Sequence, residues 1–301
     1  MADDAPAWWR GRVRRPLADP VALACALLLL LLVLAAAAAP LVETALGVDA
    51  TSVDLLARLE PPGMAHPLGT DELGRDVLLR LLQGGRISLA VGVSGALLAA
   101  AIGMLVGLVA GYAGGGVDAF LMRCTDAVIS LPLLPLLIVL AAVDLGKLGL
   151  APSGEAVSVL RIVLIVALFG WTTPARLVRA SVLSLRTREF VRAAEALGAG
   201  PARILRRHIL PNAAGPLIVA TALAIGNVIL AESVLSYLGL GVQPPLPSWG
   251  NMLTGAQELL FEAPLLALWP GLLIFATVLA FNLLGDRLEA ALDPRRRGNR
   301  A

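Results

Sequence analysis

Residues Ile87 to Tyr112 read ISLAVGVSGALLAAAIGMLVGLVAGY, a run of 26 residues without a charge that decides the fold class. A helix of about 20 apolar residues crosses the roughly 30 Å hydrocarbon core of a bilayer. The stretch therefore predicts a transmembrane helix. Its small residues recur at spacings that permit close contact with other helices, and they include Gly92, Gly95, Gly103 and Gly107.

Five further apolar runs flank this one along the chain. They cover Val21–Val42, about Val117–Val143, about Val157–Trp171, about Ala213–Tyr237 and about Pro264–Leu284. The first run is longer than the 7–15 residues typical of a signal peptide, so we interpret it as an uncleaved anchor. Pro132 and Pro135 interrupt the Val117–Val143 run and predict a kink or break there.

The overall composition agrees with six spans. Hydrophobic residues make up 58% of the 301 residues, charged residues 15%, and the mean hydropathy is +0.82. Soluble domains are about 45–50% apolar and about 25% charged, so a soluble protein is excluded. We expect an all-α polytopic membrane protein with six transmembrane helices.

Arginine and lysine are distributed unevenly between the segments that separate the spans. Eighteen of the 24 lie in the N-terminal segment, at Arg123, in the 172–212 loop or in the C-terminal tail, and the 172–212 loop alone holds eight. Because cytoplasmic loops carry the excess of positive residues, we expect both termini and this loop to be cytoplasmic. The segment 43–86 is then external.

Motifs for covalent chemistry are missing from the sequence. A G-x-x-x-x-G-K-[ST] phosphate loop does not occur, because Gly146-Lys147 is followed by Leu148, and there is no H-E-x-x-H pair. His66 and His208 are the only histidines. We therefore expect a non-enzymatic chain without a metal or cofactor of its own and without a nucleic-acid partner. Its energy must come from a gradient or from another polypeptide.

The 172–212 loop reads as a helix, a break and a second helix. Residues 188–197 are mostly good helix formers, Gly198 stands where a C-terminal cap belongs, and Pro201 suits the first turn of a helix that Pro211 closes. Phe190, Ala193, Ala194 and Leu197 form a small apolar stripe. An amphipathic helix lying on anionic lipid and a docking helix for a cytoplasmic partner fit this pattern equally well.

A resemblance separates these two interpretations. Arg192-Ala-Ala-Glu-Ala-Leu-Gly198, nine residues and then His208-Ile-Leu-Pro-Asn212 look like the EAA loop of ABC importer permeases. The family pattern is Glu-Ala-Ala, three residues, Gly, nine residues, Ile, one residue and Leu-Pro. The positions that match at this spacing are Ala193, Ala194, Gly198, Leu210 and Pro211. Arg192 replaces the family's Glu and His208 its Ile, and Glu195 lies nearby. Both departures resemble the branch of peptide transporters.

Further segments carry the same resemblance in the same order. They are His66-Pro-Leu-Gly-Thr-Asp-Glu-Leu-Gly-Arg-Asp-Val77, Pro247-Ser-Trp-Gly-Asn-Met252, Phe281-Asn-Leu-Leu-Gly-Asp-Arg287 and Leu292-Asp-Pro294. They look like hallmarks of one of the two permeases, the C-type subunit, of dipeptide, oligopeptide and nickel importers. The similarity runs from about residue 10 to the C-terminus and does not identify the substrate.

The resemblance implies the fold and the assembly. It implies a type I importer transmembrane domain in a bacterial inner membrane, paired with a second permease. Two ATPase subunits, which carry ATP and Mg, would each bind one EAA helix, and an external solute-binding protein would deliver a peptide or another small solute such as a nickel chelate. The coupling residues would be Phe190, Arg192, Ala193, Ala194, Glu195, Leu197, Gly198, His208, Leu210 and Pro211.

The implied domains are a cytoplasmic N-terminus and first anchor (1–42), an external segment (43–86), the permease core (87–285, including the coupling loop 172–212) and a basic cytoplasmic tail (286–301).

Two other classes of protein remain possible from the residues. A gradient-driven secondary transporter would favour inverted repeats and several midplane acids, and a membrane scaffold would use the 172–212 loop only as a protein dock.

Polar residues inside the fifth span are candidates for the translocation path. Glu232 lies near its outer end, where an ionisable group usually faces protein or water. It could belong to the path or outer gate, or it could be a structural partner of Arg161. Asn227 could contact the solute or form a hydrogen bond between helices.

Two external segments are candidates for contact with a binding protein. Thr70 can cap a short helix whose first turn holds Asp71 and Glu72. Gln243-Pro-Pro-Leu-Pro-Ser-Trp249 is a second stiff segment. Asp71, Glu72 and Trp249 are then possible contact residues. A lid over the helix ends explains the same residues, and interfacial anchoring is a further interpretation of Trp249.

Overall fold

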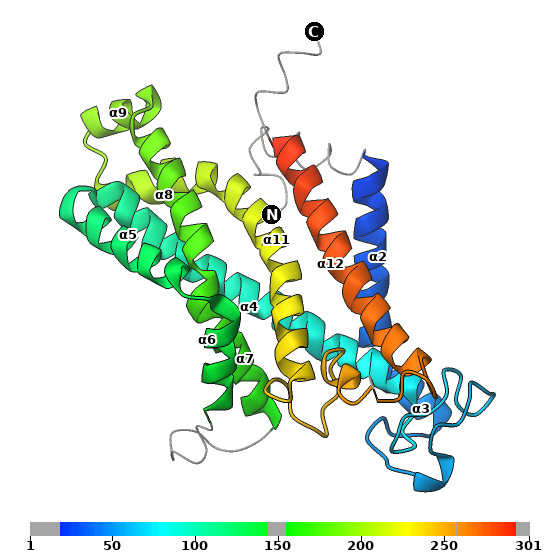
Figure 1. The fold of residues 1–301 in the computed structure, drawn as a ribbon. Coiled ribbons are helices and arrows are strands. Elements are labelled where there is room, and N and C mark those ends of the chain that lie inside the picture. The colour runs from blue at the N-terminus through cyan, green and yellow to red at the C-terminus, as the bar shows by residue number, and fades with distance from the viewer. Residues whose placement is uncertain (1–18, 144–154, 257, 293–301) are drawn as a thin grey trace.

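A computed structural model describes residues 19–143, 155–256 and 258–292 of the chain. Within these ranges the regular structure is helical, apart from one isolated β-bridge between Thr70 and Asp76. The helices, drawn in Figure 1, are α2 (Pro20–Ala37), α3 (Ala39–Leu46), α4 (Val77–Ala113), α5 (Gly115–Ser130), α6 (Leu133–Ala142), α7 (Glu155–Gly170), α8 (Thr172–Arg186), α9 (Glu189–Ala196), α10 (Pro201–Ile204), α11 (Leu210–Tyr237) and α12 (Leu265–Leu292).

Four segments are long and apolar enough to cross a membrane by themselves. They are α2, α4, the continuous stretch Pro201–Tyr237 and Leu265–Ala291. Two bent helix pairs, α5 with α6 and α7 with α8, bring the number to six in the described part of the chain if each pair is one span. The predicted all-α membrane fold is confirmed, and each expected apolar run corresponds to one of these six segments.

The structure refines two expected boundaries. The helix that contains the second span begins at Val77, before the apolar run that starts at Ile87, because the Asp76 side chain caps the helix and accepts a hydrogen bond from the Leu79 amide at 2.9 Å. The fourth apolar run ends with α7 at Gly170, where the chain bends by 43° and continues as α8. The first 15 residues of the expected 172–212 loop are therefore helical.

The third span is broken at the first of its two prolines. α5 ends at Ser130, Pro132 precedes α6, and the two helices are bent by 84°. Pro135 lies inside α6 without breaking it. Because proline disfavours helical geometry in the residue before it, Leu131 takes an extended conformation at the break.

Helix α4 is the centre of the bundle, and its glycines explain how closely its neighbours approach. A Cβ atom at Gly103 would lie 2.5 Å from the carbonyl oxygen of Trp171, and one at Gly107 would lie 2.5 Å from that of Ala175. On another face, a Cβ at Gly92 would lie 2.4 Å from the Ile229 side chain. Close packing of α4 against α8 and α11 through small residues was predicted and is confirmed.

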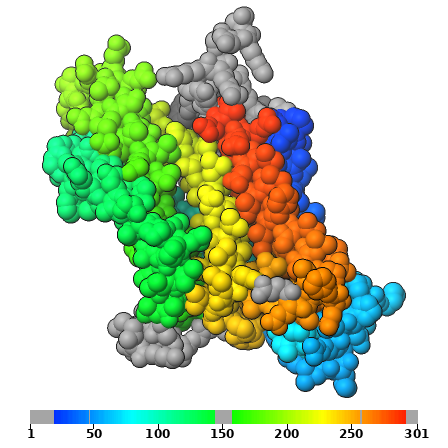
Figure 2. All heavy atoms as spheres, viewed as in Figure 1, coloured from blue at the N-terminus to red at the C-terminus, as the bar shows by residue number. Residues whose placement is uncertain are grey.

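Different segments of the chain lie at the two ends of the bundle. The start of α2, the C-terminal end of α12 and helix α9 lie at one end, and the segment 47–76 lies at the other (Figure 1). In the space-filling view, the α9 region and the 47–76 segment protrude as separate lobes at opposite ends of the molecule (Figure 2). We call the region of residues 188–200 the α9 surface and the segment 47–76 the outer segment.

Candidate functional site

One side chain fixes the position of α9. Val191 is fully buried and packs with Val178 and Val182 of α8 and with Ile204 and Ile209 of the following turns. The other residues of α9 are exposed except Ala194, which is half-buried. The apolar stripe that the sequence predicted does not face this core. The sequence pattern missed Val191 because a single apolar residue has no periodicity.

The exposed face of α9 combines apolar and charged groups. Leu197 is 89% exposed and Phe190 44% exposed, and Arg192, Ala193 and Glu195 are also exposed. The Phe190 ring lies 6.2 Å from the half-buried His208 ring, centroid to centroid. A helix of eight residues is too short to be stable without packing. This one leaves most of its apolar surface uncovered within the chain.

Gly198 ends α9 in the way that its position predicts. Its φ is +80°, and the amides of Gly198 and Ala199 donate to the carbonyls of Glu195 and Ala194 at 2.9 and 3.0 Å. This is the Schellman arrangement, in which glycine adopts the left-handed conformation without strain. No atom lies within 4 Å of a Cβ at this position, so only the backbone conformation restricts the residue.

The chain after Gly198 differs from the prediction at one point. Pro201 begins α10, as predicted. Pro211 does not close this helix, because a π-helical turn over Leu205–Ile209 joins it to α11, where Pro211 occupies the first turn. A proline at that position lacks only an amide hydrogen that has no partner inside the helix. Pro201–Tyr237 is therefore one helical stretch, which begins directly after the α9 surface.

Ion pairs join α8 to α5. The Arg179 guanidinium forms two hydrogen bonds with Asp118, at 2.5 and 2.6 Å, and Arg176 contacts Asp126 at 2.5 Å. The sequence spacing of Arg123 and Asp126 fits an ion pair within one helix. The structure contradicts this pair, because the Asp126 carboxylate accepts from Arg176 of α8 instead. α8 is therefore bonded to α5 as well as packed against α4.

Glu232 is fully buried between α4, α11 and the loop after α11. Its carboxylate accepts hydrogen bonds from the hydroxyls of Ser88 at 3.0 Å and Ser236 at 2.6 Å. These hydroxyls in turn accept from the amides of Trp249 and Val242, at 3.2 and 3.0 Å. Glu232 thus holds the loop against the helices.

The alternative that Glu232 pairs with Arg161 is wrong, since the Arg161 guanidinium donates to the carbonyl of Leu240 at 3.3 Å. Asn227 differs from Glu232, although both lie on α11. Its side chain is exposed, and it makes no hydrogen bond in the described part of the chain.

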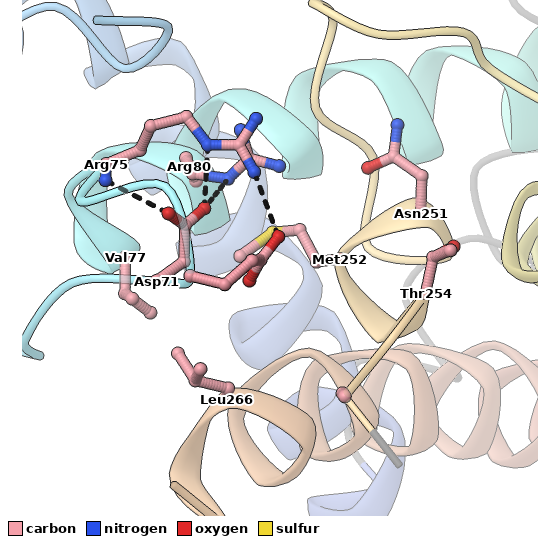
Figure 3. Close-up of a pocket in the computed structure, with 10 residues that line it drawn as sticks. Asp71, Arg75, Val77, Arg80, Asn251, Met252, Thr254 and Leu266 are labelled. Carbon is pink, nitrogen blue, oxygen red and sulfur yellow. Dashed lines mark hydrogen bonds and ion pairs between the residues drawn. The ribbon is translucent and has the colours of Figure 1, made fainter. Parts of the chain in front are cut away.

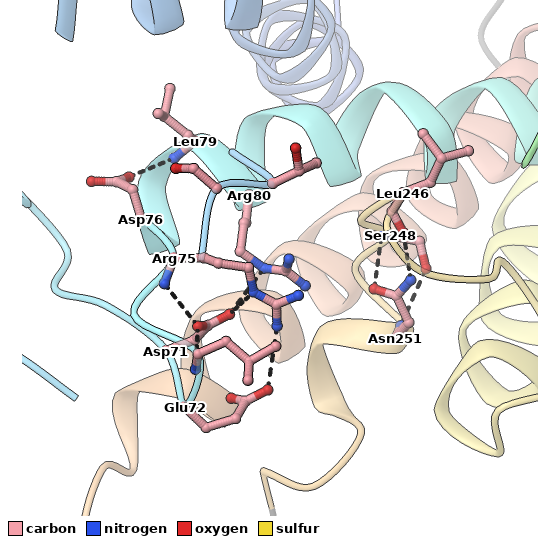
Figure 4. A network of polar contacts seen from close by, with 12 residues as sticks. Asp71, Glu72, Arg75, Asp76, Leu79, Arg80, Leu246, Ser248 and Asn251 are labelled. Atoms are coloured by element: carbon pink, nitrogen blue, oxygen red, sulfur yellow. Dashed lines mark hydrogen bonds and ion pairs between the residues drawn. The ribbon is translucent and has the colours of Figure 1, made fainter. Parts of the chain in front are cut away.

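Asp71 organises a network of polar contacts in the outer segment, shown in Figure 4. Its Oδ1 accepts from the amides of Leu73 and Arg75, at 2.9 and 3.0 Å, and its Oδ2 accepts from Arg75 Nε at 2.7 Å. Arg80 Nε lies 3.3 Å from the same oxygen. The Glu72 carboxylate is 43% exposed and lies 3.3 Å from Arg75 Nη2.

The expected short helix capped by Thr70 is wrong. The Thr70 hydroxyl donates to the carbonyl of Ala57 at 2.5 Å instead, and residues 71–74 form a turn. The prediction that Trp249 is an exposed contact residue is also wrong. Its side chain is 2% exposed, and its indole N–H donates to the carbonyl of Leu81 at 3.0 Å. The same burial excludes interfacial anchoring for Trp249.

Groups of three or more His, Cys, Asp or Glu side chains that could hold a metal ion do not occur in residues 19–143, 155–256 and 258–292. Sequence reasoning did not single out the buried Arg80, although it lies three residues after the motif that ends at Val77. One basic residue before an apolar run reads as a topology signal, and its burial comes only from the folded outer segment.

Known proteins match most of the chain. The family described as binding-protein-dependent transport system inner membrane component matches residues 103–298. The glutathione transport system permease protein GsiD of Pectobacterium atrosepticum is 41% identical over 288 residues, which cover 95% of this chain and 91% of that protein. The oligopeptide transport system permease protein OppC of Bacillus subtilis is 39% identical over 249 residues, 83% of this chain and 78% of that protein.

Solved structures agree on the fold. An inward-facing conformation of the MetNI methionine ABC transporter has a TM-score of 0.56 and 19% sequence identity, and the match covers 71% of this chain and 97% of that chain. At this identity the match concerns the fold alone.

Proposed function

This chain belongs to the family of binding-protein-dependent transport system inner membrane components, and from that membership we propose that it carries peptides inward. It is the permease component of an ABC importer and crosses the membrane several times. The relatives named for glutathione and oligopeptide transport support a peptide as the transported solute. A gradient-driven carrier is disfavoured, because this family works with a binding protein.

ATP is hydrolysed by partner chains in this proposal. The sequence holds no phosphate loop, so ATP and Mg are bound by two ATPase subunits, and this chain performs no catalysis. A second permease completes the translocation path, and an external solute-binding protein delivers the peptide. The membrane is the bacterial inner membrane, with the α9 surface and both termini on the cytoplasmic side.

The exposed α9 surface carries the proposal. Leu197, at 89% exposure, and Phe190, at 44%, lie with the exposed Ala193 at a protruding end of the molecule, and such a group of exposed apolar residues suits contact with a partner. We assign ATPase coupling to the α9 surface and the turns that support it, namely Phe190, Arg192, Ala193, Ala194, Glu195, Leu197, Gly198, His208, Leu210 and Pro211. Movement of this surface would then rock the helix bundle between inward- and outward-open states.

Within the membrane we assign different roles to the two polar residues of α11. Asn227 faces the translocation path, because it is exposed and makes no hydrogen bond within the described ranges. Glu232 supports the outer gate by holding the loop that contains Trp249. Of the proposed outer contact residues, Glu72 is accessible to a binding protein, whereas Asp71 acts by positioning Arg75 and Arg80.

Substitution of Gly198 tests the coupling role. Gly198→Asp replaces a residue at φ +80° and should change the angle between α9 and α10 without disturbing the spans. We expect normal membrane insertion but loss of ATP-driven peptide uptake in reconstituted vesicles. Gly200→Ala is the matched control, because Gly200 has φ −70° and no atom within 4 Å of an added Cβ. Normal ATPase binding and uptake by Gly198→Asp would contradict the assignment.

A further inference from the structure

A pocket lies at the end of the bundle opposite the α9 surface, between the start of α4 and the loop that leads to α12. Asp71, Arg75 and Arg80 line one side, and Asn251, Thr254 and Leu266 line the other (Figure 3). Its volume is about 30 Å³, and a site needs roughly 10–15 Å³ on this measure to hold one water. The pocket therefore accepts a small polar group but not a whole solute.

The charged side chains around this pocket are unevenly buried. The side chains of Arg75 and Arg80 are 12% and 7% exposed, and that of Asp71 is 8% exposed. Glu72 is 43% exposed and pairs with Arg75, so water screens much of its charge. Arg80 thus depends on the Asp71 carboxylate, which it shares with Arg75. That carboxylate is already saturated, because each of its oxygens receives two donors.

Arg80 also has an unused hydrogen-bond donor. Its Nη1 atom is buried and has no partner in the described part of the chain. The opposite wall has donors and acceptors that are already engaged. Asn251 Nδ2 donates to the Leu246 carbonyl at 2.8 Å, and its Oδ1 accepts from the Ser248 amide at 2.9 Å. A buried donor without a partner is costly, and the positive charge of Arg80 favours a carboxylate over a water molecule as that partner.

We propose that this pocket binds the carboxylate of an acidic side chain on the external solute-binding protein, with Arg80 as the anchor. The inference rests on the proposed function, which supplies that partner. α4 has 37 residues, far more than the roughly 20 that cross the bilayer core, and Arg80 precedes its apolar stretch. The site therefore lies outside the hydrocarbon layer, and its volume suits a carboxylate better than the larger phosphate of a lipid.

Two properties of the surroundings favour a protein as the source of this carboxylate. Leu56 and Met64 of the outer segment are 96% and 102% exposed, and Phe261 of the loop before α12 is 97% exposed, so both segments that form the pocket also present apolar groups outside the spans. The outer segment is rigid as well. A Cβ at Gly74 would lie 1.7 Å from the carbonyl oxygen of Asp54, so the turn that holds Asp71 is closely packed. Such preorganisation favours binding of a specific partner.

The test uses the complete importer in nanodiscs and measures ATPase activity against the concentration of its purified, peptide-loaded binding protein. We expect Arg80→Gln to raise the half-saturating concentration by at least about tenfold, because one partner of a buried charge pair is lost. The maximal rate should change little. Arg80→Lys keeps the positive charge but loses the paired donors of the guanidinium. Its half-saturating concentration should lie between those of the unmodified importer and Arg80→Gln. Arg58→Gln is the control, since Arg58 is exposed in the same segment and should change the value less than about twofold.

Charge reversal identifies the partner side chain and keeps the test decisive if Arg80→Gln folds poorly. Arg80→Glu is combined with single Asp→Arg or Glu→Arg variants of the binding protein, and we expect one of them to restore half-saturation. An unchanged value for Arg80→Gln, or rescue by none of the variants, overturns the proposal. A dependence on phosphatidylglycerol that disappears in Arg80→Gln would also overturn it in favour of a lipid headgroup. Failure of the proposed function differs from all of these, because the unmodified importer would then lack ATP-driven uptake.

Discussion

The α9 surface and the outer segment differ in which groups they bury: the first exposes apolar side chains, and the second buries charged ones. On the α9 surface one residue, Val191, is buried, while Leu197 and the charges around it face solvent. In the outer segment Asp71 is buried and bonded to Arg80 of α4, and tight turns shape the backbone. The first region leaves its apolar groups uncovered within the chain, and the second is already arranged within it.

Helix α4 connects the two regions. It begins beside the outer pocket, where Arg80 lies in its first turn, and it ends where Gly111 accepts a hydrogen bond from Arg186 of α8 at 3.1 Å. A rigid helix of this length can transmit a displacement between the two ends of the molecule. The comparison teaches that the proposed coupling end and the proposed receiving end differ in how their groups are buried but share one structural element.

The largest effect is expected from breaking this connection. Gly107→Leu places side-chain atoms where the Ala175 carbonyl oxygen already lies 2.5 Å from a Cβ position. α8 must then separate from α4, and we expect little folded protein in size-exclusion chromatography after extraction. Gly271→Leu is the control, because no atom lies within 4 Å of a Cβ at Gly271. Equal yields of the two variants would show that α4 and α8 need not pack so closely.

A smaller but specific effect is expected on the α9 surface. Leu197→Asp puts a charge into the proposed apolar contact, where burial of an unpaired charge is costly. We expect at least about a tenfold loss of co-purified ATPase subunit, with an unchanged melting temperature for the permease alone. Ala202→Asp on the exposed start of α10 should keep the subunit. Equal losses from both variants would mean that the contact is not centred on α9.

The sequence predicted the spans better than it predicted their ends and breaks. Apolar length reveals a membrane helix, but the true start of α4 depends on a cap by Asp76. The bend after Gly170 lies four residues before Pro174, which has no amide hydrogen to donate to the Gly170 carbonyl. The cap of α9 at Gly198 was predictable because glycine has a local conformational role. The continuation past Pro211 was not, since it depends on a π-helical turn between two proline-started helices.

The outer site illustrates a second limit of sequence reasoning. Asp71 and Trp249 were possible contacts with a binding protein because they stand in stiff external segments, and a lid over the helix ends explained them equally well. Both are buried, since Asp71 serves two arginines and Trp249 donates to the α4 backbone. These contacts join residues far apart in the chain, and neither periodicity nor spacing encodes them. The resemblance pointed to the motif that ends at Val77 and to the segment that contains Trp249. It did not point to Arg80, whose Nη1 atom lacks a hydrogen-bond partner in the described residues.

A moderate effect on stability is expected at Glu232, which joins the outer loop to α4 and α11. Glu232→Leu leaves the hydroxyls of Ser88 and Ser236 without their acceptor, at a cost of ~1–3 kcal/mol for each unsatisfied group. The melting temperature in detergent should fall more than in Glu232→Gln, which keeps an acceptor. A normal melting temperature combined with altered peptide affinity would instead place Glu232 on the path.

The smallest effect is expected at Asn227. Its side chain makes no hydrogen bond within the described residues, so Asn227→Leu should leave the melting temperature unchanged. If the side chain faces the path, the half-saturating concentration of peptide in vesicle uptake should change a few-fold. Leu105→Ala, at a position 61% exposed on α4, is the control and should change neither quantity. Destabilisation by Asn227→Leu would indicate a structural bond with the second permease instead.

Cross-linking at residue 197 tests the central claim, that the α9 surface docks an ATPase. Both native cysteines are free, so Cys25→Ser and Cys124→Ser provide a background into which Leu197→Cys is introduced. With a short photoactivatable cross-linker attached to this thiol in membranes containing the whole importer, we predict one cross-linked product between this chain and the ATPase subunit, and none from Ala202→Cys. A permease that imports peptide but gives no ATPase cross-link from residue 197 would contradict the account.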